Sequence, residues 1–225
     1  MPFTKRALGF LRGLARHNEK PWFEAHRDEY EAEVRQPMRD LIEDLDTRFA
    51  RFAPEIGGDP KRSMFRINRD IRFARDKTPY RPQMYLTFPD PAAADEGRTQ
   101  LYVGISAETV TAGFRTYAMG SAKKSRLTQV IQPRVASHAK WLVKQKTRLG
   151  RRYESYWYST EKGEWTKHTG WPVESTEWKK LQGWVVRRKF SSSAATRSTF
   201  VAEIHRLFCD VYPLFAFVSS PSWKS

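Results

Sequence analysis

The sequence predicts a single α+β domain over residues 1–225, in which N-terminal, central and C-terminal helices flank a mostly antiparallel sheet. Two observations predict this class. Apolar residues recur every three or four positions in three regions, as in amphipathic helices, and between these regions they alternate with polar residues, as in half-buried strands. The chain also has no internal repeat and no long linker. Its 40% hydrophobic and 14% aromatic content is enough to bury a substantial core.

The N-terminal region has the spacing of two successive helices. Apolar residues predict a helix over residues 3–15, and Thr4 is placed to cap its N-terminus. Pro21 suits the first position of a second helix, where its missing N–H group costs nothing. The apolar pattern then continues to Phe52. We expect Pro37 to kink or divide this second helix, because proline cannot supply an interior hydrogen bond.

The middle of the chain changes to strand periodicity. Apolar and charged residues alternate from Phe65 to Phe73, which predicts a strand with one apolar and one charged face. Strict alternation would turn Arg69 toward the apolar side. Two further segments flank Ser106–Glu108 and predict a hairpin. The predicted strands are 65–73, 84–88, 101–105, 109–117, 153–157 and 184–190, and residues 89–97 are expected to form a loop.

Helical spacing returns in the second half of the chain. It predicts a central helix over residues 127–149 with a break at Pro133. It also predicts a short helix over residues 176–181, and a C-terminal helix that starts near Phe200 and ends at Pro213.

Several well-known functional motifs are missing from the sequence. Cys209 is the single cysteine, which excludes a disulfide framework and a multi-cysteine metal site. The five histidines show no metal-ligand spacing, and no Walker, GxGxxG or GxSxG motif occurs. No metal site is predicted, while cofactor, enzymatic activity and oligomeric state stay open. Because no apolar run reaches the roughly 18 residues of a membrane span, we expect a cytoplasmic protein with no transmembrane segment.

The net charge of +15 is concentrated in two segments of the chain. Residues 61–90 contain 8 basic and 3 acidic side chains, and residues 121–152 contain 10 basic and no acidic side chains. A charge that served only to solubilise the chain would be spread more evenly. Two such segments point to a phosphorylated ligand or a nucleic acid as partner.

Two motifs of the chain are distinctive. The first is Asn18-x-Lys20-x-Trp22-Phe23 followed by Arg27 and Tyr30, and the second is the run FRINRDIRFARDKTPYR from Phe65 to Arg81. Both resemble motifs of the domain-of-unknown-function 2461 family. His17 stands where the family tends to have another asparagine. The resemblance covers residues 3–218, approximately. It implies an α+β fold and no established activity.

The second of these motifs is the candidate ligand site. On the predicted strand its polar side chains alternate to one face, and more polar residues follow in a turn closed by Pro79. The planar guanidinium of arginine suits phosphate or carboxylate, and lysine adds a point charge. The candidate ligand-binding residues are Arg66, Asn68, Asp70, Arg72, Asp76, Lys77 and Tyr80.

Two other interpretations of this motif stay open at the level of sequence. In one, the motif lines the pocket of an enzyme, with Asp70 or Asp76 as acid/base or metal ligand. In the other it is architectural, and the two aspartates hold the arginines in a salt-bridge network. A buried Arg69 would itself require a carboxylate partner.

The basic segment 121–152 predicts a separate polyanion face. Lys140, Lys144 and Arg148 recur at four-residue spacing with Arg151 close by, which would suit nucleic-acid phosphates or an anionic membrane surface. The alternative is a solvated helix face, or one that pairs with acids of the first helices. Aromatic residues between positions 153 and 171 could stack on bases where they are exposed, and would otherwise belong to the core.

Overall fold

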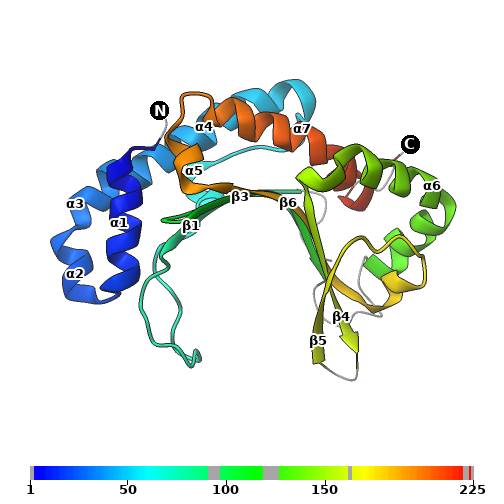
Figure 1. Ribbon diagram of the computed structural model, residues 1–225, viewed down its shortest axis with the longest axis horizontal. Coiled ribbons are helices and arrows are strands. Elements are labelled where there is room, and N and C mark those ends of the chain that lie inside the picture. The colour runs from blue at the N-terminus through cyan, green and yellow to red at the C-terminus, as the bar shows by residue number, and fades with distance from the viewer. Residues whose placement is uncertain (1–2, 91–96, 119–126, 162–163, 220–222, 224–225) are drawn as a thin grey trace. The chain divides into compact units, whose positions relative to one another are not determined.

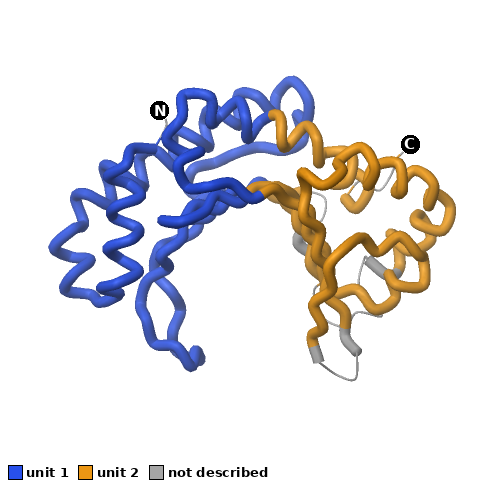
Figure 2. Tube along the Cα trace, in the orientation of Figure 1, with its two compact units in different colours: residues 1–88, 102–111, 189–205 blue, residues 89–101, 112–188, 206–225 orange. Residues whose placement is uncertain are grey.

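The computed structural model describes residues 3–90, 97–118, 127–161, 164–219 and 223 (Figure 1). It confirms the predicted α+β class, with a six-stranded antiparallel sheet and helices in the N-terminal, central and C-terminal parts of the chain. The chain forms two compact units, coloured separately in Figure 2. The first unit comprises residues 1–88, 102–111 and 189–205, and the second comprises residues 89–101, 112–188 and 206–225. The expectation of a single domain stays a prediction.

The sheet has the strand order β1-β2-β3-β6-β4-β5. Its strands are β1 (Gln83–Pro89), β2 (Gly97–Ser106), β3 (Thr109–Ala118), β4 (Glu154–Glu161), β5 (Glu164–Thr169) and β6 (Leu181–Ser191). The predicted hairpin is β2–β3, whose turn is closed by Ser106 Oγ accepting hydrogen bonds from the amides of Glu108 and Thr109. The prediction missed β5 because its sequence, EWTKHT, has almost no apolar residues to alternate.

The first unit begins with the predicted helices. They are α1 (Lys5–Arg16), α2 (Lys20–Ala25), α3 (Arg27–Glu29), the π-helical segment η1 (Tyr30–Arg35), α4 (Gln36–Phe52) and α5 (Pro60–Ser63). Thr4 caps α1 as expected, because its hydroxyl accepts from the amides of Arg6 and Ala7. Pro37 lies in the first turn of α4, directly after the widened π-helical turns of η1, and the backbone at Arg35 and Gln36 is helical. The helical region is interrupted earlier, at His26, with φ −115° and ψ 16°. The expected kink or division at Pro37 stays a prediction.

The predicted strand from Phe65 to Phe73 is wrong. Between α5 and β1 the chain forms an extended loop, visible in cyan in Figure 1, with isolated bridges at Met64–Leu86 and Asn68–Tyr80. The Arg81 guanidinium donates to the carbonyl oxygens of Arg66 and Asn68, at 2.8 and 2.6 Å. A side chain therefore satisfies backbone acceptors that a strand ladder would otherwise pair.

The second unit contains the central helix. The π-helical segment η4 (Leu127–Ile131) leads into α6 (Gln132–Leu149), which the 3-10 turn η5 (Gly150–Arg152) follows, and a second 3-10 turn is η6 (Glu177–Lys180). Pro133 lies in the first turn of α6, and the backbone at Ile131 just before it is helical, whereas the kink inside α6 lies at His138, with φ −128° and ψ 28°. The break is therefore five residues later than expected. Trp184 fills the core of this unit and makes edge contacts with Phe114 at 5.1 Å and Trp178 at 5.3 Å between ring centroids.

The C-terminal helix is longer than predicted. After the 3-10 turn η7 (Ser192–Thr196), α7 runs from Phe200 to Ser219 and passes through Pro213, where we expected it to end. Proline removes one hydrogen bond and crowds the preceding turn. Burial of Leu214, Phe215, Phe217 and Val218 offsets this cost, because each of these side chains is at most 2% exposed.

The close approach of β3 to β6 generates a stability prediction. A Cβ atom on Gly113 would lie 2.0 Å from the carbonyl oxygen of Val186. Gly113→Ala must therefore push two backbones apart, and we expect it to lower the free energy of unfolding by about 1–3 kcal/mol. Gly9→Ala is the control: it lies in α1 with nothing within 4 Å of the new Cβ. Chemical denaturation of both variants checks this, and equal stability of the two would contradict it.

Candidate functional site

The first unit contains a pocket of about 1020 Å³ that could hold a ligand. One wall comes from the helical segments α2 to α4, and the other from α5 and the loop that follows it. The lining residues are Lys20, Phe23, Glu24, Arg27, Tyr30, Glu31, Arg35, Arg39, Glu43, Pro60, Lys61, Met64, Phe65, Arg66, Ile67, Asn68, Pro79 and Tyr80.

The aromatic part of the pocket lining is well packed. Tyr80 stacks on Phe23 with ring centroids 4.3 Å apart, and Phe23 in turn contacts Tyr30 at 5.3 Å. Burial raises the pKa of Tyr30 to about 12 and also raises the pKa of Tyr80. Both phenols are therefore neutral at physiological pH and available as hydrogen-bond donors.

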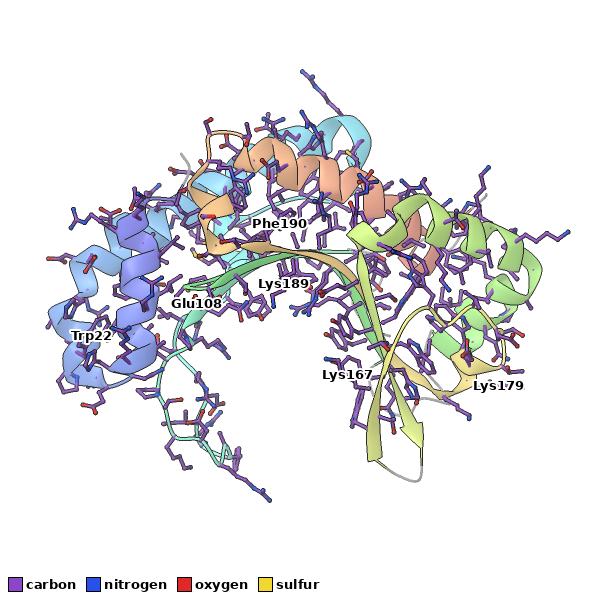
Figure 3. The ribbon with its side chains drawn as sticks, viewed as in Figure 1. Trp22, Glu108, Lys167, Lys179, Lys189 and Phe190 are labelled. Carbon is purple, nitrogen blue, oxygen red and sulfur yellow. The ribbon has the colours of Figure 1, made fainter. Side chains whose placement is uncertain are left out.

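Asn18 fixes Tyr80 in this position through its side-chain amide. Asn18 Nδ2 donates to the carbonyl oxygen of Tyr80 at 2.9 Å, and Asn18 Oδ1 accepts from the Tyr80 amide at 2.9 Å. This pair of bonds joins residues 62 positions apart. It attaches the loop to the segment between α1 and α2. Trp22 lies on α2 in the same helical region (Figure 3) and stacks on His26 at 4.0 Å.

Charged side chains line the helical wall at regular intervals. Arg27, Glu31, Arg35, Arg39 and Glu43 follow one another at four-residue spacing, which places them along one side of the helical segments. Arg35 donates to both carboxylate oxygens of Glu31 at 2.8 Å. Glu31 and Arg35, two neighbours in this series, are thus held by an ion pair.

The guanidinium of Arg27 is held by Glu24, which lies outside this four-residue series. It donates to the two oxygens of Glu24 at 2.9 and 2.7 Å, and this hydrogen bonding lowers the pKa of Glu24. The same guanidinium lies 5.3 Å from the centroid of the Phe23 ring. Two contacts therefore fix the direction of Arg27 at the edge of the pocket.

Three further cations, Arg39, Lys61 and Arg66, line the pocket. Within the described residues, no carboxylate lies within ion-pair distance of Arg39, Lys61 or Arg66. Arg39 is half-buried, while Lys61 and Arg66 are exposed. An anion that entered the pocket would meet these charges without first breaking an ion pair.

The structure distributes the predicted ligand-binding residues over several places. Arg66, Asn68 and Tyr80 line the pocket. Asp76 and Tyr80 line a smaller cavity of about 420 Å³, together with Asn18, Arg69, Thr78 and Arg81. Because the loop is not a strand, these side chains do not share the single charged face that alternation predicted.

The remaining residues of the motif lie outside both cavities. Asp70 and Arg72 pair with each other at 2.7 Å on the surface, and the hydrogen bond from Arg72 lowers the pKa of Asp70. The Lys77 ammonium donates to the carbonyl oxygens of Ile71 and Arg72 at 3.0 and 3.4 Å. These contacts hold the end of the loop, which carries the 95% exposed Phe73.

Arg69 connects the two arms of the loop. Strict alternation would have turned Arg69 toward the apolar side of a strand, but the segment forms no strand. The side chain is 24% exposed and pairs with the carboxylate of Asp76. It donates to Asp76 Oδ2 at 2.5 Å and to the Thr78 hydroxyl, while its backbone amide donates to the carbonyl oxygen of Pro79 at 2.8 Å. The architectural interpretation of the motif thus describes the pairs Arg69–Asp76 and Arg72–Asp70.

The predicted polyanion face lies in the second unit. Lys140, Lys144, Arg148 and Arg151 are all exposed. Arg148 is engaged: it donates to Gln145 at 2.9 Å and lies 3.7 Å from the Asp210 carboxylate. Three further basic residues of the segment, Lys123, Lys124 and Arg126, lie outside the described residues.

A family model described as "Conserved hypothetical protein (DUF2461)" matches residues 6–217. The chain belongs to this family. No curated protein matches it. The DUF2461 match includes both motifs that carry the resemblance, and the structure brings these motifs together at the contacts of Tyr80 with Asn18 and Phe23.

Across the described ranges, no cluster of three His, Cys, Asp or Glu side chains could hold a metal ion. None of the described helices is both long enough and apolar enough to span a bilayer.

Sequence reasoning missed most of the helical wall of the pocket. Arg27 was noted only as part of the family resemblance. Four further lining residues were not predicted as site residues: Glu31, Arg35, Arg39 and Glu43. The signal that could have found them is their four-residue spacing beside the apolar positions of the same helical region.

The attachment by Asn18 generates a second prediction. Asn18→Ala leaves the backbone N–H and C=O of Tyr80 without these partners, and we expect it to lower the free energy of unfolding by about 1–3 kcal/mol. Hydrogen exchange at the Tyr80 amide should accelerate in this variant. Glu19→Ala, an exposed neighbour whose side chain makes no capping bond, is the control. Unchanged protection of the Tyr80 amide would contradict the assignment.

The pairing of Arg69 generates a third prediction. The Thr78 amide and the Arg69 guanidinium donate to the Asp76 carboxylate, which lowers its pKa from 3.8 to about 2. Because the folded pKa is depressed, these contacts persist above pH 3.8 and are lost as the pH falls through about 2. Side-chain carboxyl NMR titration should give this low pKa. Arg69→Ala should raise it, whereas Arg75→Ala, on the same loop, should not. Equal effects of the two substitutions would rule out the pairing.

Proposed function

We propose that the first unit binds a small organic ligand that carries a phosphate or carboxylate group, and that the ligand occupies the pocket of about 1020 Å³. One observation carries this proposal. Arg39, Lys61 and Arg66 line the same pocket, and within the described residues none of them is engaged by a carboxylate. Guanidinium and ammonium groups in this arrangement suit an anionic group.

The balance of charge around the pocket supports the same ligand class. The lining contains six basic side chains and three acidic ones, Glu24, Glu31 and Glu43. Glu24 and Glu31 hold Arg27 and Arg35 in place, so part of the positive wall is pre-organised. A ligand that met pre-organised cations would lose less free energy in ordering side chains on binding.

The size of the pocket supports a ligand larger than a free ion. Ligand pockets have volumes of roughly 300–1,000 Å³, and this one has about 1020 Å³. Apolar surface from Phe65, Met64 and Pro60 is available for a ring or carbon skeleton. We therefore expect the anionic group near Arg66 and the apolar part of the ligand against the aromatic lining.

The contacts of the aspartates favour binding over catalysis. Asp70 and Asp76, the acids that an enzyme built on the motif would use, pair with Arg72 and Arg69 and do not line the large pocket. A purely architectural role accounts for these two pairs. It does not account for Arg39, Lys61 and Arg66, the uncommitted cations of the pocket lining.

The proposal is tested with phenyl phosphate as probe, because it combines a phosphate group with an aromatic ring. Isothermal titration should show saturable binding to the full chain. Arg66→Ala and Lys61→Ala should each raise Kd by about 10- to 100-fold, the range expected for the loss of one charge-assisted hydrogen bond.

Arg62→Ala is the matched control for these variants. Arg62 is adjacent to Lys61 in sequence and exposed, but it pairs with Asp59 and is not part of the pocket lining. The variant should bind phenyl phosphate as tightly as the unmodified chain. Equal weakening by Arg62→Ala and Lys61→Ala would show only diffuse attraction, and the pocket proposal would then fail.

A further inference from the structure

We propose that the second unit binds single-stranded nucleic acid on one face of the strands β3, β4, β5 and β6, which we call the aromatic face. The proposal is independent of the pocket in the first unit. The residues of this face are Tyr117, Tyr156, Tyr158, Trp165, Lys167 and Arg187.

Strand register places these side chains on the same side of the sheet. Tyr158 pairs with Lys167 of β5, and Trp165 pairs with Thr160, two residues further along β4. Directly paired residues share a face, and residues two apart along a strand share it too. Tyr156 therefore joins Tyr158 on this face. Glu154 lies two residues before Tyr156 on β4 and so shares this face. Its direct partner on β6, Arg187, shares it too.

Exposure distinguishes this face from the opposite one. On the opposite face Trp157 and Trp184 are buried, with exposed fractions of 9% and 0%. On the aromatic face Trp165 is 57% exposed, and Tyr156 and Tyr158 are half-buried. Trp165 meets only the edge of Tyr158, at 5.6 Å and 69°, so much of the indole remains accessible. Tryptophan is usually mostly buried, which makes this exposure informative.

A glycine extends the row of rings across the sheet. Gly183 of β6 is the direct partner of Tyr158, and a Cβ atom at this glycine would lie 2.9 Å from the ring of Tyr117. The Tyr117 ring therefore covers the place that a side chain on β6 would otherwise occupy. Tyr117, Tyr158 and Trp165 thus provide aromatic surface on three different strands of the second unit.

Cations lie directly beside these rings. The Lys167 ammonium is 4.4 Å from the centroid of Tyr156, and the Arg187 guanidinium is 4.8 Å from the same centroid. Arg187 also contacts Glu154 at 3.0 Å, so the exposed Lys167 is the cation most accessible to a phosphate. Figure 3 shows Lys167 on the β4–β5 hairpin.

Charge and ring chemistry together indicate the partner. Residues 112–188 contain 17 basic and 5 acidic side chains, which gives this part of the chain a strong attraction for a polyanion. Aromatic side chains add affinity by stacking on bases. Stacking requires unpaired bases, because a duplex hides their faces. A single strand is thus the polyanion that would use both features of the face.

The test measures fluorescence anisotropy of a labelled oligothymidylate of about 20 nucleotides, longer than the site of one stacking platform, with the full chain. We expect Trp165→Ala to raise Kd about 5- to 100-fold, the range of losing one base stack. Trp165→Phe should restore most of the affinity. A duplex of the same length should bind more weakly than the single strand.

Two lysine variants separate the local contact from overall charge. Lys167→Ala should lower the slope of log K against log salt by about 0.7, the value for one single-strand phosphate contact. Lys179→Ala is the matched control, since Lys179 is also exposed but lies on η6 (Figure 3). It should leave affinity and slope unchanged. Melting curves of each variant confirm that it remains folded.

The following results would overturn the proposal. The oligonucleotide does not bind, the duplex binds as tightly as the single strand, or Lys179→Ala weakens binding as much as Lys167→Ala. Unchanged affinity of Trp165→Ala for the oligonucleotide would also overturn the proposal, because binding would then rest on charge alone.

Discussion

The pair of hydrogen bonds between Asn18 and the backbone of Tyr80 is the constraint on which the organisation of the first unit depends. Residues 65–82 form no regular strand, and the backbone hydrogen bonds between their two arms are few: the amides of Arg69 and Arg81 donate to the carbonyl oxygens of Pro79 and Ile67, both at 2.8 Å. The amide of Asn18 satisfies both backbone groups of one residue and brings the Tyr80 ring onto Phe23. With Tyr80 fixed, the Arg66 side of the pocket stands opposite the helical wall.

The same loop shows how one set of charges serves two purposes. Arg69, Arg72 and Arg81 donate to carboxylates and carbonyl oxygens within the loop and so replace missing backbone pairing. Arg66 has no such role for its side chain and lines the pocket instead. Arginines of one sequence motif therefore have different places in the structure. Arg69, Arg72 and Arg81 bond within the loop, whereas Arg66 lines the pocket.

Local signals made much of the fold predictable, while long-range contacts did not. Thr4 could be assigned as a cap because its capping bonds come from the amides of Arg6 and Ala7, two and three residues further along the chain. The alternation from residue 65 to 73 gave a false strand, since the decisive partners are side chains and the distant Asn18. Likewise, nothing in the sequence around Trp165 separates it from the buried Trp157. Only strand register assigns them to opposite faces.

A double-mutant cycle with phenyl phosphate tests most directly whether Asn18 positions the ligand-binding wall. Affinity is measured for Asn18→Ala, Arg66→Ala and the double variant, under conditions where all remain folded. If Asn18 acts by holding the loop that carries Arg66, the double variant should bind phenyl phosphate with the same affinity as the single variant that binds it less tightly. Additive losses, or full affinity in Asn18→Ala, would contradict this account.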